Sequence, residues 1–398
     1  MTMLADVTAG LTVFGVLACL AGLIATLRFL AWPSPAPKER PPITILKPLC
    51  GEEPQLEEAL ASCCRQNYPA FQIVFGLHSC TDPALAAVRR VQERFPDRDI
   101  AVVVDATLHG SNRKVSNLIN MLPYARHDLL VISDSDLHVP PDYLDRLVAE
   151  MEKSGAGLVT CASIGRPPAG FGWPAKLGAT QMTCTFLPGV MLSRIAGRQD
   201  CLGSTTMLRR ETLDRTGGLH PLADVLAEDN LMGQRIRELG LSIGLADVIP
   251  AATISQRSLG TLWHHELRWA RTIRASVPFT HGASAAQYPL FWAALTCVLS
   301  GCALWGIGLY ALSWLVRAAA MMGIDAALRR KEGQLAWAGS VWMLPLRDVL
   351  SVAEIFASFW VEDVIWRGHR MSANGIAADR LAPGIAPILN TPRLAQGD

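Results

Sequence analysis

The sequence predicts an α/β fold, with a mostly parallel central sheet covered by helices on both faces and further apolar helices at both ends of the chain. Two observations indicate the sheet. Short apolar runs alternate with amphipathic helical patterns, and the runs are continuously apolar, as in strands buried on both faces. A third observation indicates the terminal helices, because long apolar stretches lie near the N-terminus and after residue 288.

The first apolar stretch, residues 9–27, contains no charged side chain. At a rise of about 1.5 Å per residue, a helix of this length spans a hydrocarbon layer of about 30 Å. A cleaved signal peptide fits less well, because no basic segment precedes the run and no small-residue cleavage site follows it. We therefore expect a transmembrane anchor over 1–32 and a stiff, proline-rich linker over 33–42.

Alternating strands and helices follow the linker, and each is predicted from the period of its apolar residues. The expected strands are 43–49, 71–79, 100–106, 128–136 and the run GLVTCAS after it. The expected helices are 56–67, 83–95, 114–125 and 141–155. Because ligands bind beyond the carboxyl ends of the strands in open sheets of this kind, the polar residues at those ends are the candidate site.

The segment from 200 to 280 is mixed and closes with an amphipathic helix, which completes a domain over 43–280. One face of this helix is basic and aromatic, with His265, Arg268 and Trp269 at spacings of three and four residues. Its expected apolar stripe consists of Leu259, Leu262, Trp263, Leu267, Ala270 and Ile273.

Residues 281–370 are expected to return to the membrane, before a cytoplasmic tail over 371–398. The apolar run over 288–316 predicts either one tilted span or a tight hairpin of two short helices. The basic segment LRRKEG (328–333) argues for a cytoplasmic loop at that point and therefore favours the hairpin.

A third apolar stretch, 334–361, is interrupted by Arg347 and Asp348. Charges inside a membrane span are costly unless they are paired. The stretch therefore predicts either a span with an internal ion pair or a re-entrant or interfacial helix.

The distribution of charge predicts the orientation of the chain. Only Asp6 precedes the first apolar stretch, whereas basic residues follow it, so the positive-inside rule places residues 33 onward in the cytoplasm. The ten cysteines show neither metal spacing nor a disulfide pattern, as expected of reduced thiols in that compartment. The net charge of +1 offers no broad attraction to nucleic acid.

The stretch LLVISDSD ends a buried strand in two carboxylates, Asp134 and Asp136. Burying either carboxylate without a partner would cost several kcal/mol of folding free energy, and a bound divalent cation removes this cost. Mg²⁺ and Mn²⁺ suit such hard oxygen ligands and take phosphate oxygens for their remaining positions. We therefore predict a metal–diphosphate site here. In the alternative, Asp134 caps the following turn and Asp136 is solvated.

Downstream acids at Glu228-Asp229 and the motif HELRW (265–269) complete a set that resembles the family-2-like, inverting glycosyltransferases of the GT-A fold. More narrowly, the chain resembles the ceramide glucosyltransferase family, and closest of all the bacterial hopanoid-biosynthesis-associated glycosyltransferases. The motifs that carry this resemblance are ILKPLCGEEP, DATLHGSNRKVSNLINMLPYARHDLLVISDSD and LWHHELRWARTIR, within roughly residues 40–280.

The resemblance implies roles for the acids. Asp105 would contact the uracil or the ribose, and Asp134 and Asp136 would hold the metal and the donor diphosphate. Because the ceramide branch keeps the first acid of this pair and loses the second, the metal assignment depends more on Asp134. Asp229 would be the general base that deprotonates the acceptor hydroxyl. In the alternative, Asp105 is a capping residue at the end of a strand. Glu228 and Asp229 are then acids at the N-terminus of a helix, where the helix dipole favours negative charge.

The remaining roles are also implied by the resemblance. Arg268 would grip the leaving diphosphate and Trp269 would offer a flat face to the acceptor or the sugar. His265 stands where the broader family has Gln or Arg, so its role is open, and an interfacial helix with snorkelling arginines is the alternative for the whole motif. The other residues placed around the nucleotide-sugar are Lys47, Pro48, Glu52, Lys114, Gly203 and Ser204.

The expected function is a multi-pass glycosyltransferase of the bacterial inner membrane that depends on Mg²⁺ or Mn²⁺. The resemblance implies transfer from UDP-N-acetylglucosamine, with inversion, to a hopanoid polyol such as bacteriohopanetetrol. The alternatives are a ceramide glucosyltransferase that uses UDP-glucose, a processive polysaccharide synthase and a non-catalytic lipid-binding scaffold. The scaffold predicts damaged acidic positions, whereas Asp105, Asp134 and Asp229 are all present.

Overall fold

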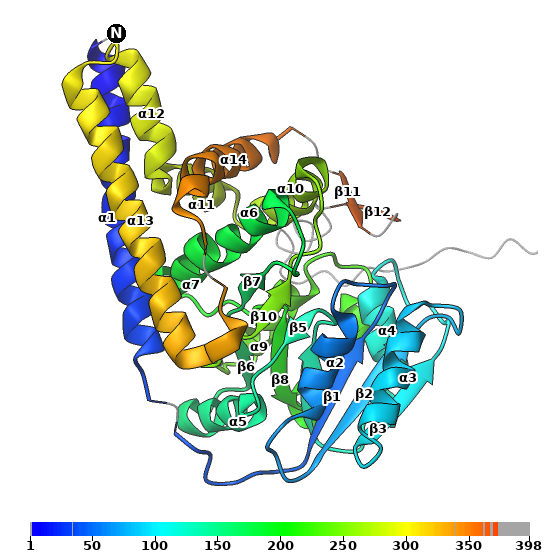
Figure 1. The fold of residues 1–398 in the computed structure, drawn as a ribbon. Helices are drawn as coiled ribbons and strands as arrows, with labels where there is room; N and C mark the ends of the chain where they lie inside the picture. The colour runs from blue at the N-terminus through cyan, green and yellow to red at the C-terminus, as the bar shows by residue number, and fades with distance from the viewer. Residues whose placement is uncertain (1, 34, 338, 361–362, 367–368, 373–398) are drawn as a thin grey trace, which may run out of the picture.

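The computed structural model describes residues 2–33, 35–337, 339–360, 363–366 and 369–372. Its centre is a seven-stranded sheet with the order β3-β2-β1-β4-β8-β6-β9 (Figure 1). Neighbouring strands are parallel except that β8 is antiparallel to both β4 and β6. The strands are β1 (Ile43–Pro48), β2 (Phe71–Leu77), β3 (Asp99–Val104), β4 (Leu129–Ser133), β6 (Leu158–Cys161), β8 (Thr205–Arg209) and β9 (Ile243–Ala246).

Helices cover both faces of this sheet, and the alternation of side chains along β1 shows why. Ile43 and Ile45 pack with one set of helices, α2 (Leu56–Cys64), α3 (Ala84–Arg94) and α5 (Tyr143–Ser154). Leu46 points to the other face and packs with α4 (Arg113–Met121), α8 (Arg210–Arg215) and α9 (Glu228–Glu238). The predicted fold class, an α/β domain with a mostly parallel central sheet covered by helices on both faces and apolar helices at both ends, is confirmed.

A small second sheet lies against the carboxyl end of β4. It has the order β5-β10-β7, with β5 (Leu137–His138), β7 (Ile164–Arg166) and β10 (Ala251–Thr253). β10 is antiparallel to β5 and parallel to β7. The short sheet therefore extends directly from the residues that follow β4.

Two long apolar helices, α1 (Thr2–Leu30) and α13 (Leu304–Glu332), run side by side away from the sheet domain (Figure 1). Within the part of the chain that the structure describes, these are the two helices whose length and composition suit a membrane crossing. Large apolar side chains on them face outward, with Phe14 55%, Leu17 60% and Leu315 66% exposed. In a helix from the core of a soluble protein such residues would be buried.

The hairpin that the sequence favoured is present, but its arms are unequal. α12 (Pro289–Leu299) has 11 residues and α13 has 29. The predicted basic loop is wrong, because residues 328–332 form the last turns of α13. Basic residues are stabilising at a helix C-terminus, and Glu332 at its end is buried and pairs with Arg146 of α5 at 2.8 Å. α13 is thus fastened to the sheet domain.

The charges in the third apolar stretch do not pair as predicted. This stretch forms α14 (Leu344–Ala357), whose 14 residues are too few to cross a bilayer. Arg347 pairs with Glu266 of α10 (Leu259–Ser276) at 2.8 Å and with Glu354 at 3.0 Å. Asp348 pairs instead with Arg317 of α13 at 3.0 Å. The two charges join α14 to two other helices.

Several expected boundaries shift. The linker is not free, because the Lys38 and Glu39 amides donate to the Glu152 carboxylate at 2.8 and 2.9 Å. Of the predicted stripe on α10, Leu259 and Ile273 are exposed, whereas Leu262, Leu267 and Ala270 are buried. The predicted tail lies outside the described residues from 373 onward. The remaining elements are α6 (Trp173–Gln181), α7 (Leu187–Ile195), α11 (Pro278–Ala283), β11 (Asp363–Trp366) and β12 (His369–Ser372).

Candidate active site

Asp134, Ser135 and Asp136, here called the acid turn, follow the last residue of β4. Backbone hydrogen bonds fix the turn on both sides. The Asp134 amide donates to the Ser204 carbonyl at 3.1 Å, and the Thr253 amide donates to the Asp136 carbonyl at 3.1 Å. The predicted site residue Ser204 therefore contacts the turn through its backbone.

Lys114 joins the acid turn to the start of α9. Its Nζ lies 2.7 Å from Asp134 Oδ1 and 2.9 Å from Glu228 Oε1. Burial opposes the charge on Lys114, but the two carboxylates outweigh it and hold the pKa above its usual value. Lys114 is positioned because Asn112, whose side chain accepts a hydrogen bond from the Val115 amide, caps α4.

Asp229 lies beside this cluster on the first turn of α9. Burial, and then the adjacent charge of Glu228, raise its pKa to about 6. Its carboxylate packs against the backbone at Gly203, since a Cβ at position 203 would lie 2.6 Å from Asp229 Oδ2. The structure therefore brings Asp134, Asp229, Lys114 and Gly203 together, while the roles of these residues stay predictions.

The second acid of the turn lies in a different setting. Burial, then the charge of Glu53, then that of Asp134, raise the pKa of Asp136 to about 7. Ser135 Oγ donates to Glu53 Oε2 at 2.6 Å, so Glu53 lies against the acid turn, whereas the predicted Glu52 is exposed.

Lys47 lies beneath the acid turn. It is 0% exposed, and its ammonium donates to Ser133 Oγ at 3.2 Å and to the Asp134 carbonyl. Pro48 follows it, half-buried, at the end of β1. Lys47 thus places a buried positive charge under the two aspartates, although the sequence suggested only that it borders the nucleotide pocket.

Asp105 lies at the same edge of the sheet but farther away. β2 and β1 separate β3 from β4, which corresponds to about 14 Å at the usual strand spacing. Asp105 therefore does not share an ion with Asp134. Hydrogen bonds from Thr107 lower the pKa of Asp105, and His78 contacts the carbonyls of Asp105 and Arg113 at 3.1 and 2.9 Å.

The HELRW motif lies on α10, which begins with a capping box between Ser258 and Thr261. The rings of His265 and Trp269 meet edge to face with centroids 4.5 Å apart. Burial, and then the charge of Arg268, lower the pKa of His265 to about 3, so its imidazole is neutral near pH 7.

A hydrogen bond ties α10 to the start of α9. Asn230, the residue after Asp229, donates through Nδ2 to Ser276 Oγ at 2.9 Å. The far face of α10 is held by the pair of Glu266 with Arg347. The functions of His265, Arg268 and Trp269 toward a donor stay predictions.

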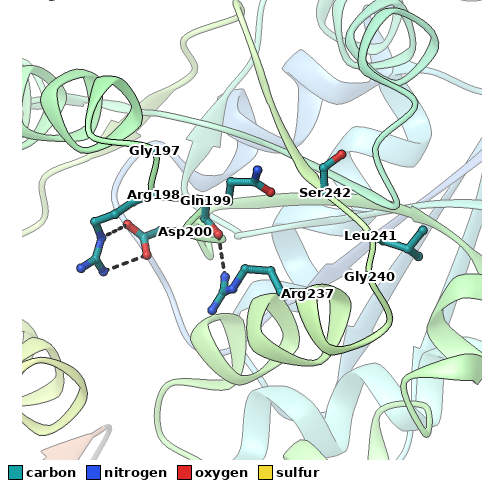
Figure 2. Close-up of a pocket in the computed structure, with 8 residues that line it drawn as sticks. All are labelled: Gly197, Arg198, Gln199, Asp200, Arg237, Gly240, Leu241 and Ser242. Atoms are coloured by element: carbon teal, nitrogen blue, oxygen red, sulfur yellow. Dashed lines mark hydrogen bonds and ion pairs between the residues drawn. The ribbon is translucent and has the colours of Figure 1, made fainter.

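One surface cavity, of about 570 Å³, lies away from this cluster. The residues that line it come from the segment after α7 and from the C-terminal end of α9 with the turn that follows, whereas Asp229 lies on the first turn of α9. Arg198 pairs with Asp200 at 2.9 Å, and Arg237 donates to the Gln199 carbonyl at 2.6 Å (Figure 2). These charged groups already have partners within the chain, so the cavity is not a candidate for the donor site.

The sequence pattern of Glycosyl transferase family 21 matches residues 10–376. The chain belongs to this family. Ceramide glucosyltransferase 1 of Caenorhabditis elegans is 24% identical over 241 residues, which cover 60% of this chain and 51% of the relative. The ceramide glucosyltransferase of Komagataella phaffii is 29% identical over 124 residues, which cover 30% of this chain and 24% of the relative. The family 21 chain thus spans about half the length, or less, of these curated relatives.

Solved structures with low identity also align with the family 21 chain. The mannosyltransferase PcManGT from Pyrobaculum calidifontis, in complex with GDP-Man and Mn²⁺, is 22% identical with a TM-score of 0.49, over 90% of this chain and 99% of that one. S. aureus TarS 1–349, in complex with UDP-GlcNAc, is 15% identical with a TM-score of 0.38, over 84% and 97%. At such identities the likeness concerns the fold alone.

The carboxylate oxygens that the family 21 chain offers as metal ligands fit a divalent cation that takes its other ligands from a bound substrate. Within the described residues no three His, Cys, Asp or Glu side chains form a ready-made metal cluster. Asp134 and Asp136 supply two hard oxygen donors, and the Asp136 carboxyl is buried beside Glu53 and Asp134. Mg²⁺ typically binds through one or two carboxylates and takes its other ligands from phosphate and water.

Gly203→Ala should disturb the site of this family 21 chain more than its fold. The new Cβ would lie 2.6 Å from Asp229 Oδ2, so that the carboxylate must move. We expect a loss of stability of about 1–3 kcal/mol and, for the predicted role of Asp229 as the base, a fall in sugar transfer of about 100-fold, the effect of displacing a catalytic group by 1 Å. Thermal unfolding and initial rates measure the two effects.

Gly189→Ala in α7 is the matched control for this substitution, because a Cβ there has no atom within 4 Å. It should leave sugar transfer unchanged and keep or slightly raise the stability, because alanine favours a helix more than glycine does. Equal activity of the two variants would contradict the close contact between Gly203 and Asp229.

Proposed function

We propose that the chain is an inverting, UDP-sugar-dependent glycosyltransferase whose acceptor is a hydroxyl group of a membrane lipid. The observation that carries this proposal is the pairing of Lys114 with both Asp134 and Glu228, which holds the acid turn next to Asp229. Groups suited to a diphosphate and a group suited to accept a proton thus lie in one place, in a chain of family 21.

Asp229 acts as the general base. Its pKa of about 6 keeps it mainly ionised at neutral pH and still basic enough to accept the proton of a hydroxyl as that oxygen attacks the sugar. Gly203 leaves room for the carboxylate in the direction of the acid turn. Fixing base and acceptor in one geometry supplies much of the rate by proximity.

Lys114 and Arg268 stabilise the departing UDP. Lys114 keeps its charge because two carboxylates flank it. A bound diphosphate would replace one of these carboxylates as the partner of the Lys114 ammonium. A divalent cation held by Asp134 and Asp136 would add positive charge at the leaving diphosphate. Arg268 can donate to phosphate oxygens in a bidentate manner.

Exposed apolar and aromatic side chains on the outer surface of the molecule support an acceptor that lies in the membrane. The exposed apolar faces of α1 and α13 suit a bilayer. Exposed aromatic side chains on the adjoining helices, Phe279 at 85%, Trp342 at 75% and Trp360 at 77%, suit the interface between lipid and water. We place the protein in the bacterial inner membrane with the sheet domain in the cytoplasm.

The substrates that we propose are UDP-N-acetylglucosamine and a hopanoid polyol such as bacteriohopanetetrol. The motifs that resemble the hopanoid-associated enzymes support them. Transfer from UDP-glucose to ceramide is the second candidate, and its support is the similarity to ceramide glucosyltransferases.

Mass spectrometry of lipid products tests the proposal. The purified full chain in nanodiscs receives equal UDP-glucose and UDP-N-acetylglucosamine, with a hopanoid polyol and ceramide as competing acceptors. We expect an N-acetylhexosamine on the polyol. A hexose on ceramide would favour the second candidate. The absence of both lipid products and of UDP release would contradict the proposal and leave the non-catalytic scaffold.

The rate of transfer should depend on the ionisation of Asp229. The base works as a carboxylate, and its pKa is raised from 3.8 to about 6, so activity is present above pH 6 and is lost as the pH falls through that value. With saturating substrates the rate should fall about tenfold per pH unit below the pKa. Initial rates between pH 5 and 8 measure this profile, and a rate that stays constant down to pH 5 would contradict it.

A further inference from the structure

The turn between α12 and α13 brings two cysteines together. α12 ends at Leu299, and the Gly301 amide donates to the Val298 carbonyl at 3.0 Å. The Cys302 amide donates to the Cys297 carbonyl at 2.8 Å. These two bonds, with a left-handed glycine at φ 67°, form a Schellman motif. In this motif the side chain after the glycine contacts the last turn of the helix, and here both contacting residues are cysteines.

The geometry of this turn suits a covalent bond between the two sulfurs. The side chains of Cys297 and Cys302 are joined by a hydrogen bond, and both residues are free thiols in the structure. A disulfide requires Cα atoms within about 7 Å and Cβ atoms that face each other. Thiols that touch across a hydrogen-bonded backbone meet this requirement. Cys302 is exposed, so that an oxidant can reach it.

The turn lies at the end of the apolar helices that points away from the sheet domain (Figure 1). Thr296 of α12 donates to Thr8 of α1 at 2.8 Å, so the turn lies level with the first residues of α1. The other end of this helix pair adjoins the sheet domain, where Lys331 donates to the Trp32 carbonyl at 3.1 Å.

The length of α1 places the turn at the opposite face of the membrane. Residues 7–27 carry no charge, and at about 1.5 Å per residue they cover about 30 Å, the thickness of the hydrocarbon layer. Trp305, which follows the turn, is 50% exposed, as suits a tryptophan at the interface between lipid and water. With the sheet domain in the cytoplasm, the turn faces the oxidising compartment outside the inner membrane.

We propose that Cys297 and Cys302 form a disulfide bond that closes the turn between α12 and α13. The oxidant is another disulfide, either of a protein or of glutathione. The thiolate of Cys302 attacks one sulfur of the oxidant and releases the first thiol, and Cys297 then displaces the second. One S–S bond forms while one breaks, and two electrons and two protons pass to the oxidant.

The bond would fix the junction of two membrane helices by restricting the unfolded turn. The sequence predicted reduced thiols for all ten cysteines, and this expectation is kept for Cys50 and Cys80, which are exposed in the sheet domain. The inference rests on the orientation within the proposed function, and not on its substrates or its base.

Differential alkylation of the full chain in a bacterial host tests this proposal. The cells are quenched with acid, blocked with N-ethylmaleimide in denaturant, reduced, and labelled with iodoacetamide. Cleavage after arginine leaves both cysteines on the peptide 275–317, which contains no other cysteine. Mass spectrometry should find iodoacetamide on Cys297 and Cys302, and N-ethylmaleimide on Cys50 and Cys80. Dithiothreitol in the growth medium should bring N-ethylmaleimide onto the peptide 275–317.

Two variants accompany this measurement. Cys302→Ser leaves a single thiol in the turn, so N-ethylmaleimide should label Cys297, and sugar transfer should equal that of the wild type. Cys80→Ser is the matched control, because it removes an exposed cysteine of the sheet domain. It should leave the label on the peptide 275–317 unchanged.

N-ethylmaleimide on both Cys297 and Cys302 in cells grown without dithiothreitol would overturn the disulfide, whether or not the chain transfers sugar. Iodoacetamide on Cys50 and Cys80 as well would contradict the orientation and overturn the assignment with it. A disulfide found in a chain that transfers no sugar would support this inference while the proposed function fails.

Discussion

Asp229→Asn should lower the rate of sugar transfer by about 10²–10⁴-fold, the usual contribution of a general base. Asparagine has nearly the same shape, so the contact with Gly203 is kept, but its amide cannot accept the proton of the acceptor hydroxyl. The affinity for the UDP-sugar should be retained, because Lys114 and the acid turn are unchanged. Turnover assays and calorimetric titration with UDP measure the two quantities.

Glu238→Gln is the control for this variant. It removes an acid from the C-terminal end of the same helix, where Glu238 accepts a hydrogen bond from Gln234 at 2.9 Å. Its activity should be that of the wild type. If the affinity of Asp229→Asn for UDP fell as much as its turnover, Asp229 would belong to the donor site and the assignment as base would be wrong.

Arg347→Met should destabilise the protein by about 3–5 kcal/mol, the usual cost of leaving buried charges without their partner. Arg347 is fully buried, and it binds Glu266 of α10 and Glu354 of α14 at 2.8 and 3.0 Å. Its removal leaves two carboxylates close together in the interior. Because Glu266 lies within HELRW, sugar transfer should fall as well. Denaturant titration in detergent micelles and initial rates measure these effects.

Two further variants separate the buried network from a general effect of losing an arginine. Arg90→Met removes an exposed pair with Glu57, and such a pair contributes about 0–1 kcal/mol. The triple variant with Glu266→Gln and Glu354→Gln should recover part of the stability lost in Arg347→Met, because it removes the unpaired charges. A loss below about 1 kcal/mol in Arg347→Met would show that the network does not hold α10.

The strands and the first helices of the sheet domain could be predicted because each is encoded locally. A run such as ITILKPL is apolar on both faces, and the structure has a strand over Ile43–Pro48. The positions of Asp134 and Asp105 followed from the same argument, since both come directly after such runs. The alternative interpretation of Glu228 and Asp229, acids at the N-terminus of a helix, is confirmed as regards the structure, since α9 begins at Glu228, whereas the sequence did not predict the distance of Asp229 from Asp134.

The partners of the buried charges could not be predicted. Arg347 and Asp348 are adjacent in sequence, yet they bind carboxylate and guanidinium groups on two different helices. Only the packing of α10, α13 and α14 decides which charges meet. Lys47 is a similar case, because an apolar run indicates a strand but not that its lysine is buried beneath the acid turn.

Two other features were missed for geometric reasons. Glu52 and Glu53 are equivalent in sequence, and the turn before α2 alone decides that Glu53 faces the acid turn. The left-handed backbone of Gln55 carried no sequence signal, because such a position is usually recognised by glycine or asparagine. A search for non-glycine residues with positive φ finds it only after the fold is known.

We propose that each UDP released at the Asp134–Asp229 cluster corresponds to one sugar transferred to a membrane lipid. Counting UDP and lipid glycoside in the same reaction, for the wild-type chain in nanodiscs, tests this most directly. We expect equal amounts of the two products from the wild-type chain, and about 10²–10⁴-fold less of both from Asp229→Asn. UDP formed without lipid glycoside, or transfer by Asp229→Asn at the wild-type rate, would contradict the account.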